Sequence, residues 1–392
     1  LLEISRINLA MEKVGVLVVN YGTEGTAFID TGRRSTKYDI DWVVYDRQAN
    51  PFNLSVVRDS HNDHMVGNLK DADAIAEFAR QHKDKHNLRF AVVLHENPIL
   101  AGAREKIEQA AGIPVLCPTS DYAIEGSKVR QRYMFQEICP EVNPQFMVFD
   151  PQEYRAMHHV KDRFYRWLDE LECQVAIKPD KPGQGKGVGV WGDHFQIPDD
   201  AWEHFLSLYE TGDMVIVEEK EDCEEFSTQN SSDGILSFRI PRLVRDYKRA
   251  YDNDKGPNTG SMGAYSDTGL LPFVTENEYK QTMDYDQKIF NRLKGPASRN
   301  INLWGLSPIY DAYAITNKGL KIFEINSRPA NPEFINLLPL MEDDLVDVCL
   351  DMIEGKSKPL RLRPLATVGI YLVPEPYPNR DDLQRKIDLN DA

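Results

Sequence analysis

The sequence predicts an α/β protein: an N-terminal domain built on a doubly wound parallel sheet, a centre of mixed α and β structure, and a small C-terminal part that contains β-strand. In the first third of the chain, short runs of β-branched residues alternate with helical patterns, which is typical of parallel βαβ units. After residue 126, strand-like segments follow that are joined by Gly-rich or polar turns. The 392 residues, of which 41% are hydrophobic, allow roughly two to four domains with a sizeable core.

The N-terminal domain is expected over residues 11–125. Its apolar runs are short and rich in Val, as buried parallel strands are. The elements expected here are strands at 14–19, 42–45 and 90–94 and helices at 71–83 and 98–111, the second closed by Gly112. A domain of this kind often binds its ligand at the carboxyl ends of the strands.

A central domain is expected over residues 126–355, with a smaller subdomain at about 140–220. Residues 356–392 would then begin a further domain. The elements expected are helices at 127–137, 151–171, 199–210 and 336–354 and strands at 145–149, 174–178, 214–219, 235–240, 308–316, 320–325 and 366–373. Because the chain starts at Leu1 and its last domain is short, we expect that this is not the whole protein.

The composition limits the classes of partner. The formal net charge is −16, which argues against a broad nucleic-acid surface, because such a surface needs clustered Lys and Arg. No apolar stretch approaches the roughly 20 residues that span a bilayer. The five cysteines are far apart and favour a reducing cytoplasm over structural disulfides. We expect small-molecule partners and neither nucleic acid nor membrane; the sequence does not predict an oligomeric state.

The first motif is the Gly-rich segment at 177–190, IKPDKPGQGKGVGV. It departs from the Walker pattern because Gly187 follows Lys186 where Ser or Thr would stand. Glycines let the backbone approach phosphate oxygens, and Lys178 and Lys186 would supply positive charge. A flexible hairpin turn explains the segment about equally well.

The second motif is the acidic segment at 215–227, VIVEEKEDCEEFS. An apolar strand that runs into Glu218 and Glu219 could present backbone groups to an adenine, and Glu225 could offer a carboxylate to a ribose. For a bare run of charge, an acidic surface hairpin is the better explanation.

The third motif, at 246–265, contains Gly256, Pro257, Asn258, Gly260 and Gly263. We predict a long loop without regular structure, and loops of this length are often functional. The nearby cations and the interleaved Met262 and Tyr265 favour an ordered ligand loop.

The fourth motif predicts a metal site. Asp311 lies on one predicted strand, and Glu324 and Asn326 lie two residues apart on the next, so that both point to one face. Oxygen ligands without Cys or His suit Mg²⁺ that is held jointly with phosphates. The alternative is a solvent-facing strand, which the apolar residues around Glu324 disfavour. His61 and His64 also suggest metal, but two polar loop histidines are the better explanation.

Together these motifs resemble an ATP-grasp ligase, and the family they resemble is phosphoribosylamine–glycine ligase. The resemblance runs from EGSK at 125–128 to about residue 378, and its most specific part is KGPNTGSMGAY at 255–265. FEINSR at 323–328 is similar to the metal strand of that family, and LLPLMEDDL at 337–345 to its closing helix. The central domain would then be an ATP-grasp domain whose small subdomain is a lid.

The resemblance also implies roles for single residues. The ATP-binding residues would be Lys128, Lys178, Gly185, Lys186, Gly187, Glu218, Glu219, Lys220, Glu221 and Glu225. The substrate loop would comprise Gly256, Pro257, Asn258, Thr259, Gly260, Met262 and Gly263. Arg328, Lys248 and Asp233 would be catalytic, and Asp311, Glu324 and Asn326 would hold Mg²⁺, with Mn²⁺ as an alternative. Asp311 fits the broader ATP-grasp pattern better than the single family.

Several positions depart from the family pattern. The turn after the first strand reads NYGTEGTAFID at 20–30 in place of a Gly-rich Arg-Glu-His turn, and Asn331, Tyr247 and Cys223 replace Asp, His and Gly. Three functions stay open. The first is ATP-dependent joining of glycine to 5-phosphoribosylamine. The second is an ATP-grasp ligase for another acid–amine pair, and the third is a degenerate ATP-binding protein.

Overall fold

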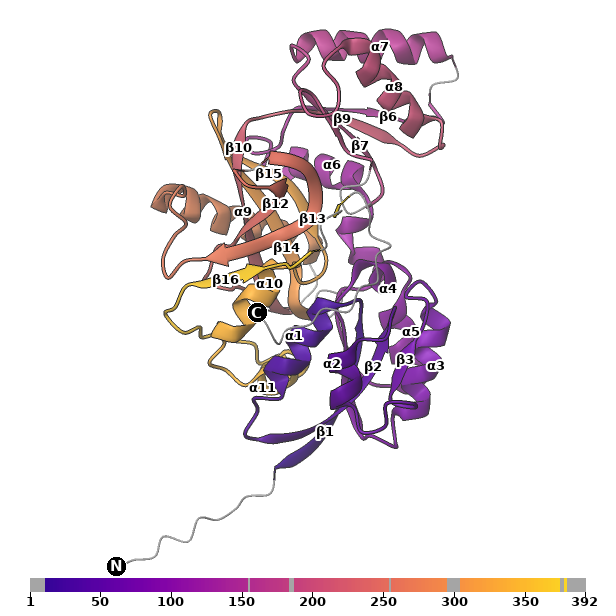
Figure 1. Cartoon of the computed structure of the whole chain (residues 1–392), viewed down its shortest axis with the longest axis vertical. Coiled ribbons are helices and arrows are strands. Elements are labelled where there is room, and N and C mark those ends of the chain that lie inside the picture. The colour runs from indigo at the N-terminus through magenta and orange to yellow at the C-terminus, as the bar shows by residue number, and fades with distance from the viewer. Residues whose placement is uncertain are drawn as a thin grey trace, which may run out of the picture.

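The computed structural model describes residues 11–153, 156–182, 187–253, 255–294, 304–373, 377 and 378. A five-stranded parallel sheet stands at one end of the molecule, and a small four-stranded sheet with two helices stands at the other (Figure 1). Two further sheets lie between them. Within the described residues, none of the helices has the length and apolarity needed to cross a membrane.

The N-terminal sheet has the strand order β3-β2-β1-β4-β5, with every neighbouring pair parallel. Its strands are β1 Glu12–Asn20, β2 Tyr38–Asp46, β3 His64–Val66, β4 Leu88–Val93 and β5 Val115–Leu116. The three predicted strands at 14–19, 42–45 and 90–94 are confirmed. The chain order reverses between β1 and β4, so a crevice is expected at the carboxyl ends of these two strands.

Five helices belong to the N-terminal domain: α1 Thr23–Gly32, α2 Pro51–Val56, α3 Ala72–His82, α4 Glu96–Leu100 and α5 Ala103–Ala111. The helix predicted at 71–83 is confirmed as α3, which Asp71 caps through the backbone N–H of Ala74. The single helix predicted at 98–111 is wrong. It is divided at Gly102, whose φ of 79° takes it out of the helical region, whereas Gly112 closes α5 as expected.

The small sheet has the order β6-β9-β7-β8 and is antiparallel. It consists of β6 Phe146–Phe149, β7 Val175–Pro179, β8 Gly189–Val190 and β9 Val215–Glu219, and it is covered by α7 Met157–Glu170 and α8 Pro198–Tyr209. Phe149, Phe164 and Phe205 are buried in a separate aromatic core between the helices and the sheet. These elements, residues 146–219, are called the lid below. The boundaries predicted for the domains stay predictions.

The larger central sheet has the order β11-β10-β14-β15, and a three-stranded sheet has the order β12-β13-β16. Their strands are β10 Cys223–Asp233, β11 Ser237–Arg239, β12 Arg245–Tyr251, β13 Lys255–Ser266, β14 Trp304–Thr316, β15 Gly319–Asn326 and β16 Thr367–Ile370, and the helices beside them are α6 Lys128–Ile138 and α9 Glu276–Lys294. Helix α9 is not among the elements predicted from the sequence.

Two predictions in the central domain are wrong. The loop predicted around 256–263 is strand β13, which pairs with β12 and with β16, because its glycines do not prevent backbone pairing. The helix predicted at 336–354 is divided into α10 Glu333–Leu337, a 3₁₀ turn at Leu338–Leu340 and α11 Leu345–Glu354. Pro339 stands in that turn, where it cannot donate a helical hydrogen bond.

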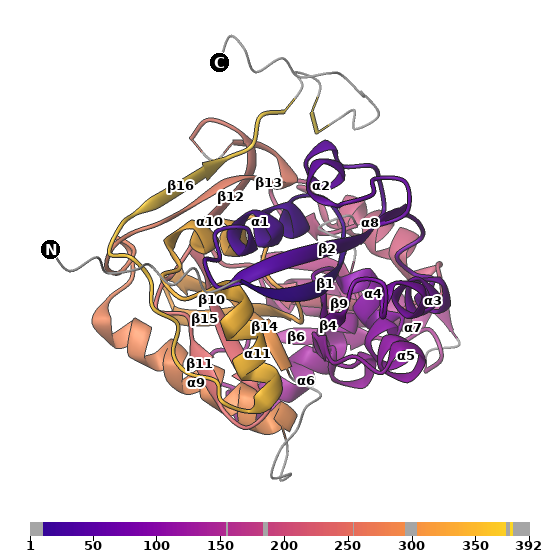
Figure 2. The ribbon, with the colours of Figure 1, turned by 90° about the horizontal axis from the view of Figure 1, so that it is seen from below.

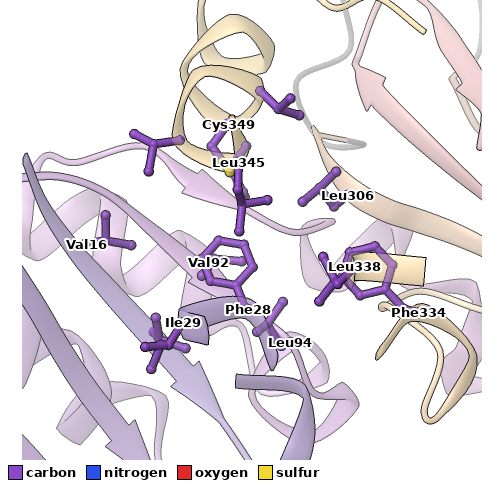
Figure 3. Packing of buried hydrophobic residues seen from close by; sticks show 14 of the residues in the cluster. Val16, Phe28, Ile29, Val92, Leu94, Leu306, Phe334, Leu338, Leu345 and Cys349 are labelled. Atoms are coloured by element: carbon purple, nitrogen blue, oxygen red, sulfur yellow. The ribbon is translucent and has the colours of Figure 1, made fainter. Parts of the chain in front are cut away.

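The N-terminal and central domains share one hydrophobic core. Val16, Phe28 and Val92 pack in the same cluster as Leu338 and Cys349 (Figure 3). Helix α1 lies beside α10 and α11 when the molecule is seen from below (Figure 2). This shared core fixes the carboxyl ends of β1 and β4 relative to the segment that follows β15.

Candidate active site

Two oxygen ligands lie side by side at the end of β15. Glu324 and Asn326 point to the same face of the strand, and the Asn326 amide nitrogen donates to Glu324 Oε1 at 3.3 Å. Burial raises the pKa of Glu324, but Lys128, Lys248 and Lys178 outweigh burial and lower it below its usual value. Glu324 is therefore an anion held among three cations. Hard oxygen donors of this kind fit Mg²⁺ together with the oxygens of a phosphate chain.

The three lysines around Glu324 come from three different elements. Lys128 begins α6, where the Ser127 hydroxyl accepts a capping hydrogen bond. Lys178 lies near the end of lid strand β7, and Lys248 lies on β12. A phosphate chain beside Glu324 would meet positive charge from the central domain, from the lid and from the β12–β13 hairpin.

Glu218 holds one of these lysines in place. It is buried and accepts hydrogen bonds from the Arg132 guanidinium at 2.7 and 3.0 Å and from Lys178 Nζ at 2.6 Å. Burial opposes its ionisation, but Arg132 and Lys178 lower its pKa to about 2. The side chain of Glu218 is thus an internal counterion that orients Lys178, and it is not free to bind a nucleotide.

Residues 220–222 connect the lid to β10, so they form the hinge where the sequence places an adenine. Lys220 donates from Nζ to the Trp191 carbonyl at 2.7 Å, and Lys318 forms ion pairs with both Glu219 and Glu221. These contacts leave the hinge backbone as the part that could face a base.

Glu225 follows the hinge on β10 and accepts a hydrogen bond from Lys248 Nζ at 2.5 Å. Burial lowers the pKa of Lys248, but Glu225 and Asp246 raise it above its usual value. This ion pair connects Glu225, which is predicted to bind the ribose, to Lys248, which lies near Glu324.

The predicted substrate residues lie on the β12–β13 hairpin. Thr259 donates to the Lys248 carbonyl at 2.9 Å, and the Gly256 carbonyl accepts from Arg249 at 2.9 Å. Arg249 also forms an ion pair with Asp193 of the lid at 2.6 Å. The other predicted substrate residues also lie on β13, namely Pro257, Asn258, Gly260, Met262 and Gly263. The tip of the hairpin therefore reaches the lid across the candidate ATP site.

Part of the predicted phosphate loop lies outside the described residues, namely Gly185 and Lys186. Gly187 is described; its φ is 83° and its carbonyl is 3.1 Å from His204 Nε2. This positive φ fits a tight turn that favours glycine.

The prediction of Asp311 as a metal ligand is wrong. On β14, Ala312 pairs with Glu324 and Tyr310 with Asn326, whereas Asp311 pairs with Ile325 and points to the opposite face. Asp311 is fully buried beside Asp286, and burial together with Asp286 raises its pKa well above the usual value. A side chain on the opposite face of the sheet cannot share an ion with Glu324.

The prediction of Asp233 as a catalytic residue is also wrong. Asp233 ends β10, eight positions beyond Glu225 on the same strand, which corresponds to roughly 26 Å. Its carboxylate accepts hydrogen bonds from the backbone N–H groups of Ile235, Leu236 and Ser357 at 2.9 to 3.2 Å. Asp233 closes a turn and fixes the segment after α11.

Arg328 lies beside residues that follow β1 and β4, where the crevice is expected. Its Nε lies 3.4 Å from Glu96 and 3.6 Å from Glu125. Burial raises the pKa of Glu125 to about 7 against the opposing effect of Arg328. Burial likewise raises the pKa of Glu24, at the start of α1, to about 7. The crevice therefore holds one buried cation among several carboxyl groups.

Most of these carboxyl groups are not among the residues predicted from the sequence. Glu24 follows β1 and Glu96 follows β4, so the rule that ligands bind at strand carboxyl ends could have found them. Glu125 stands two residues before the Ser127 cap, and Asp246 is the second residue of β12. Burial and the nearby Glu333 raise the pKa of Asp246 to about 7.

The sequence is similar to proteins of one known family. Residues 149–334 match the family model described as phosphoribosylglycinamide synthetase, ATP-grasp (A) domain. The phosphoribosylamine–glycine ligase of Methanopyrus kandleri is 31% identical over 377 residues, which cover 94% of this chain and 78% of that protein. The chain belongs to the phosphoribosylamine–glycine ligase family.

Solved structures agree with this family at the level of fold. The phosphoribosylamine–glycine ligase of Thermotoga maritima has a TM-score of 0.66 at 20% identity and covers 93% of this chain and 82% of its own. A second similar structure is the biotin carboxylase domain of the Hydrogenobacter thermophilus 2-oxoglutarate carboxylase, solved with MgADP. Its TM-score is 0.63 at 14% identity, and the match covers 91% of this chain and 74% of that chain. The ligase family thus shares its ATP-grasp fold with enzymes of other names.

Proposed function

We propose that this protein joins glycine to 5-phosphoribosylamine and gives glycinamide ribonucleotide, ADP and phosphate, a step of purine biosynthesis. Membership of the phosphoribosylamine–glycine ligase family supports this function. The observation that carries the chemistry is the pair of Glu324 and Asn326 on one face at the end of β15, where Lys128, Lys178 and Lys248 lower the pKa of Glu324. The five free cysteines are consistent with a cytoplasmic location.

ATP would lie between the lid and the central sheet. The hinge backbone at 220–222 would face the adenine, Glu225 the ribose, and the lysines the phosphates. Glu324 and Asn326 would hold Mg²⁺, which neutralises charge on the phosphate chain when bound; Mn²⁺ is a possible substitute. Because phosphoryl transfer depends mainly on positioning and electrostatics, fixed cations around the γ-phosphate are the main requirement.

Two nucleophilic attacks would follow. The glycine carboxylate attacks the γ-phosphorus, ADP leaves, and an acyl phosphate forms. The amine of the second substrate then attacks the acyl carbon, phosphate leaves, and the amide forms with loss of a proton. The lid and the β12–β13 hairpin would exclude water, which would otherwise hydrolyse the acyl phosphate. Arg328 would face the acceptor in the crevice.

An ADP-release assay tests the proposal. With Mg-ATP, release should require both glycine and phosphoribosylamine generated in situ, and Glu324→Ala should abolish it while the circular dichroism spectrum stays unchanged. Glu324 accepts from Asn326 alone among the hydrogen bonds described, and the spectrum checks that the three lysines around Glu324 tolerate the loss of its charge.

The other two functions predict different results. Turnover only with other acid–amine pairs would favour a ligase of different specificity, which the departures at residues 20–30 and at Asn331 allow. Tight ATP binding without turnover on any pair would favour a degenerate ATP-binding protein. Unchanged turnover in Glu324→Ala would contradict the metal assignment.

A further inference from the structure

A second cluster of ligand-type side chains lies in the N-terminal domain, away from the crevice at the carboxyl ends of its strands. Asp63 precedes β3, His82 ends α3, and His86 lies in the turn before β4. One ligand atom of each lies within 4.8 Å of those of the other two, and all three residues are buried. His86 N–H donates to the His82 carbonyl at 3.1 Å, which continues the helical turn and stacks the two rings.

The hydrogen bonds of the two rings fix which nitrogen faces the cluster. His82 Nδ1 donates to the Phe78 carbonyl at 2.8 Å, and His86 Nδ1 donates to the Asp41 carboxylate at 2.9 Å. The other ring nitrogen of each histidine, Nε2, faces Asp63, and in the neutral tautomer with Nδ1–H it carries the lone pair that a metal ion needs. Carbonyl or carboxylate partners on the distal nitrogen are the usual second shell of metal-binding histidines.

The distances between the ligand atoms lie on both sides of the value for a tetrahedral ion. Asp63 Oδ1 lies 3.0 Å from His86 Nε2 and 3.8 Å from His82 Nε2. Zinc bonds of about 2.0–2.2 Å in a tetrahedron separate the ligand atoms by about 3.3–3.6 Å. The Asn62 carbonyl, 2.8 Å from His82 Nε2, could supply a fourth ligand.

The cluster contains acceptors that face one another. His86 Nε2 is buried and has no hydrogen-bond partner among the described residues, and in the tautomer with Nδ1–H the lone pair of His82 Nε2 would face the Asn62 carbonyl oxygen. Such contacts are unfavourable unless a cation or a proton stands between the atoms. Lys85 Nζ contacts Asp63 Oδ1 at 2.6 Å, but its side chain is 50% exposed and could turn to solvent when an ion replaces its charge.

We propose that Asp63, His82 and His86 bind one divalent transition-metal ion of the zinc class, with the Asn62 carbonyl as a further ligand. Two imidazoles and a carboxylate suit zinc better than Mg²⁺. The ion would join the end of α3 to the segment before β3 and would have a structural role. The proposal does not depend on the ligase function.

Zinc titration of the untagged full-length protein tests this site. After treatment with a chelator, the wild-type protein should bind one equivalent of Zn²⁺ in isothermal titration calorimetry, and its melting temperature should rise with zinc concentration. His82→Ala and His86→Ala should each lose this equivalent. His61→Ala, an exposed histidine of the same segment, and Glu324→Ala, at the candidate Mg²⁺ site, should retain it.

A wild-type measurement keeps the test decisive if a histidine variant fails to fold. Co²⁺ bound in place of zinc should give the intense visible absorption of a four-coordinate ion. Absence of zinc binding, loss of the equivalent in Glu324→Ala, or its retention in both histidine variants would overturn the proposal. A weak, octahedral Co²⁺ spectrum would overturn it as well.

Discussion

At the scale of single residues, charge is arranged so that cations and carboxylates hold one another before any ligand arrives. Glu218 illustrates this arrangement, because it joins Arg132 of α6 to Lys178 of the lid inside the protein. Breaking a buried ion pair by removing one partner leaves an uncompensated charge in a medium of low dielectric constant. The same charge on the surface would be solvated and screened.

Glu218→Gln should therefore destabilise the protein by about 3–5 kcal/mol. Glu77→Gln, which removes an exposed Glu–Arg pair on α3, should cost less than about 1 kcal/mol. Urea unfolding of both variants measures the difference. Equal effects would contradict the account of Glu218 as an internal counterion.

The raised pKa of Glu24 predicts that the stability of the folded protein depends on pH. Its pKa is raised by burial to about 7 in the folded protein, so the folded state binds this proton more tightly than the unfolded state. The contribution of this proton to the free energy of unfolding is present below pH 4.5 and is lost as the pH rises through 7. The loss is about 3 kcal/mol at most. Glu24→Gln should thus gain stability over the wild type at pH 8 but not at pH 4.5.

Thermal unfolding at the two pH values measures this gain. Asp30→Asn, an exposed change on the same helix, serves as the control and should show no such pH dependence. If Glu24→Gln and the wild type differ equally at both pH values, the raised pKa of Glu24 is wrong.

At the scale of elements, the predictions succeeded where one sequence pattern determined one structure. The Val-rich runs of β1 and β4 are buried on both faces, and the Asp71 and Ser127 caps begin their helices. They failed where long-range pairing decides the structure. A glycine-rich segment carries no periodicity, so β13 could be assigned only once β12 and β16 were seen beside it.

The candidate site follows the same division. The spacing of Glu324 and Asn326 predicts a shared face without knowledge of the fold. The orientation of Asp311 depends on the register of β14 against β15, and the grouping of Glu24, Glu96 and Glu125 around Arg328 depends on contacts between distant segments. Neither can be obtained from local pattern.

The antiparallel pairing of β13 with β16 can be tested at this scale. Gly263 has a φ of 149°, and an added Cβ would lie 2.3 Å from the Gly369 carbonyl oxygen. Gly263→Ala should cost about 2 kcal/mol. Gly260→Ala, in the same strand but with no atom within 4 Å of an added Cβ, should cost much less; similar losses in urea unfolding would contradict the assigned pairing.

At the scale of the whole molecule, three parts meet at one site. The N-terminal sheet supplies the crevice, the central sheet supplies Glu324 and Arg328, and the lid supplies Lys178. The shared hydrophobic core fixes the first two parts relative to each other, whereas the lid is joined through the hinge at 220–222 and through polar contacts such as Arg249 with Asp193. This division would suit the proposed function, in which the acceptor site is fixed and the lid covers the ATP site.

The central claim is that a glycine carboxylate is activated by phosphoryl transfer at this site. Glycine labelled with ¹⁸O in both carboxylate oxygens, supplied with Mg-ATP and phosphoribosylamine, tests it most directly. Attack of the carboxylate on the γ-phosphorus predicts that each phosphate released carries one ¹⁸O atom, detected by mass spectrometry. Unlabelled phosphate formed at the same rate as the amide product would contradict the claim.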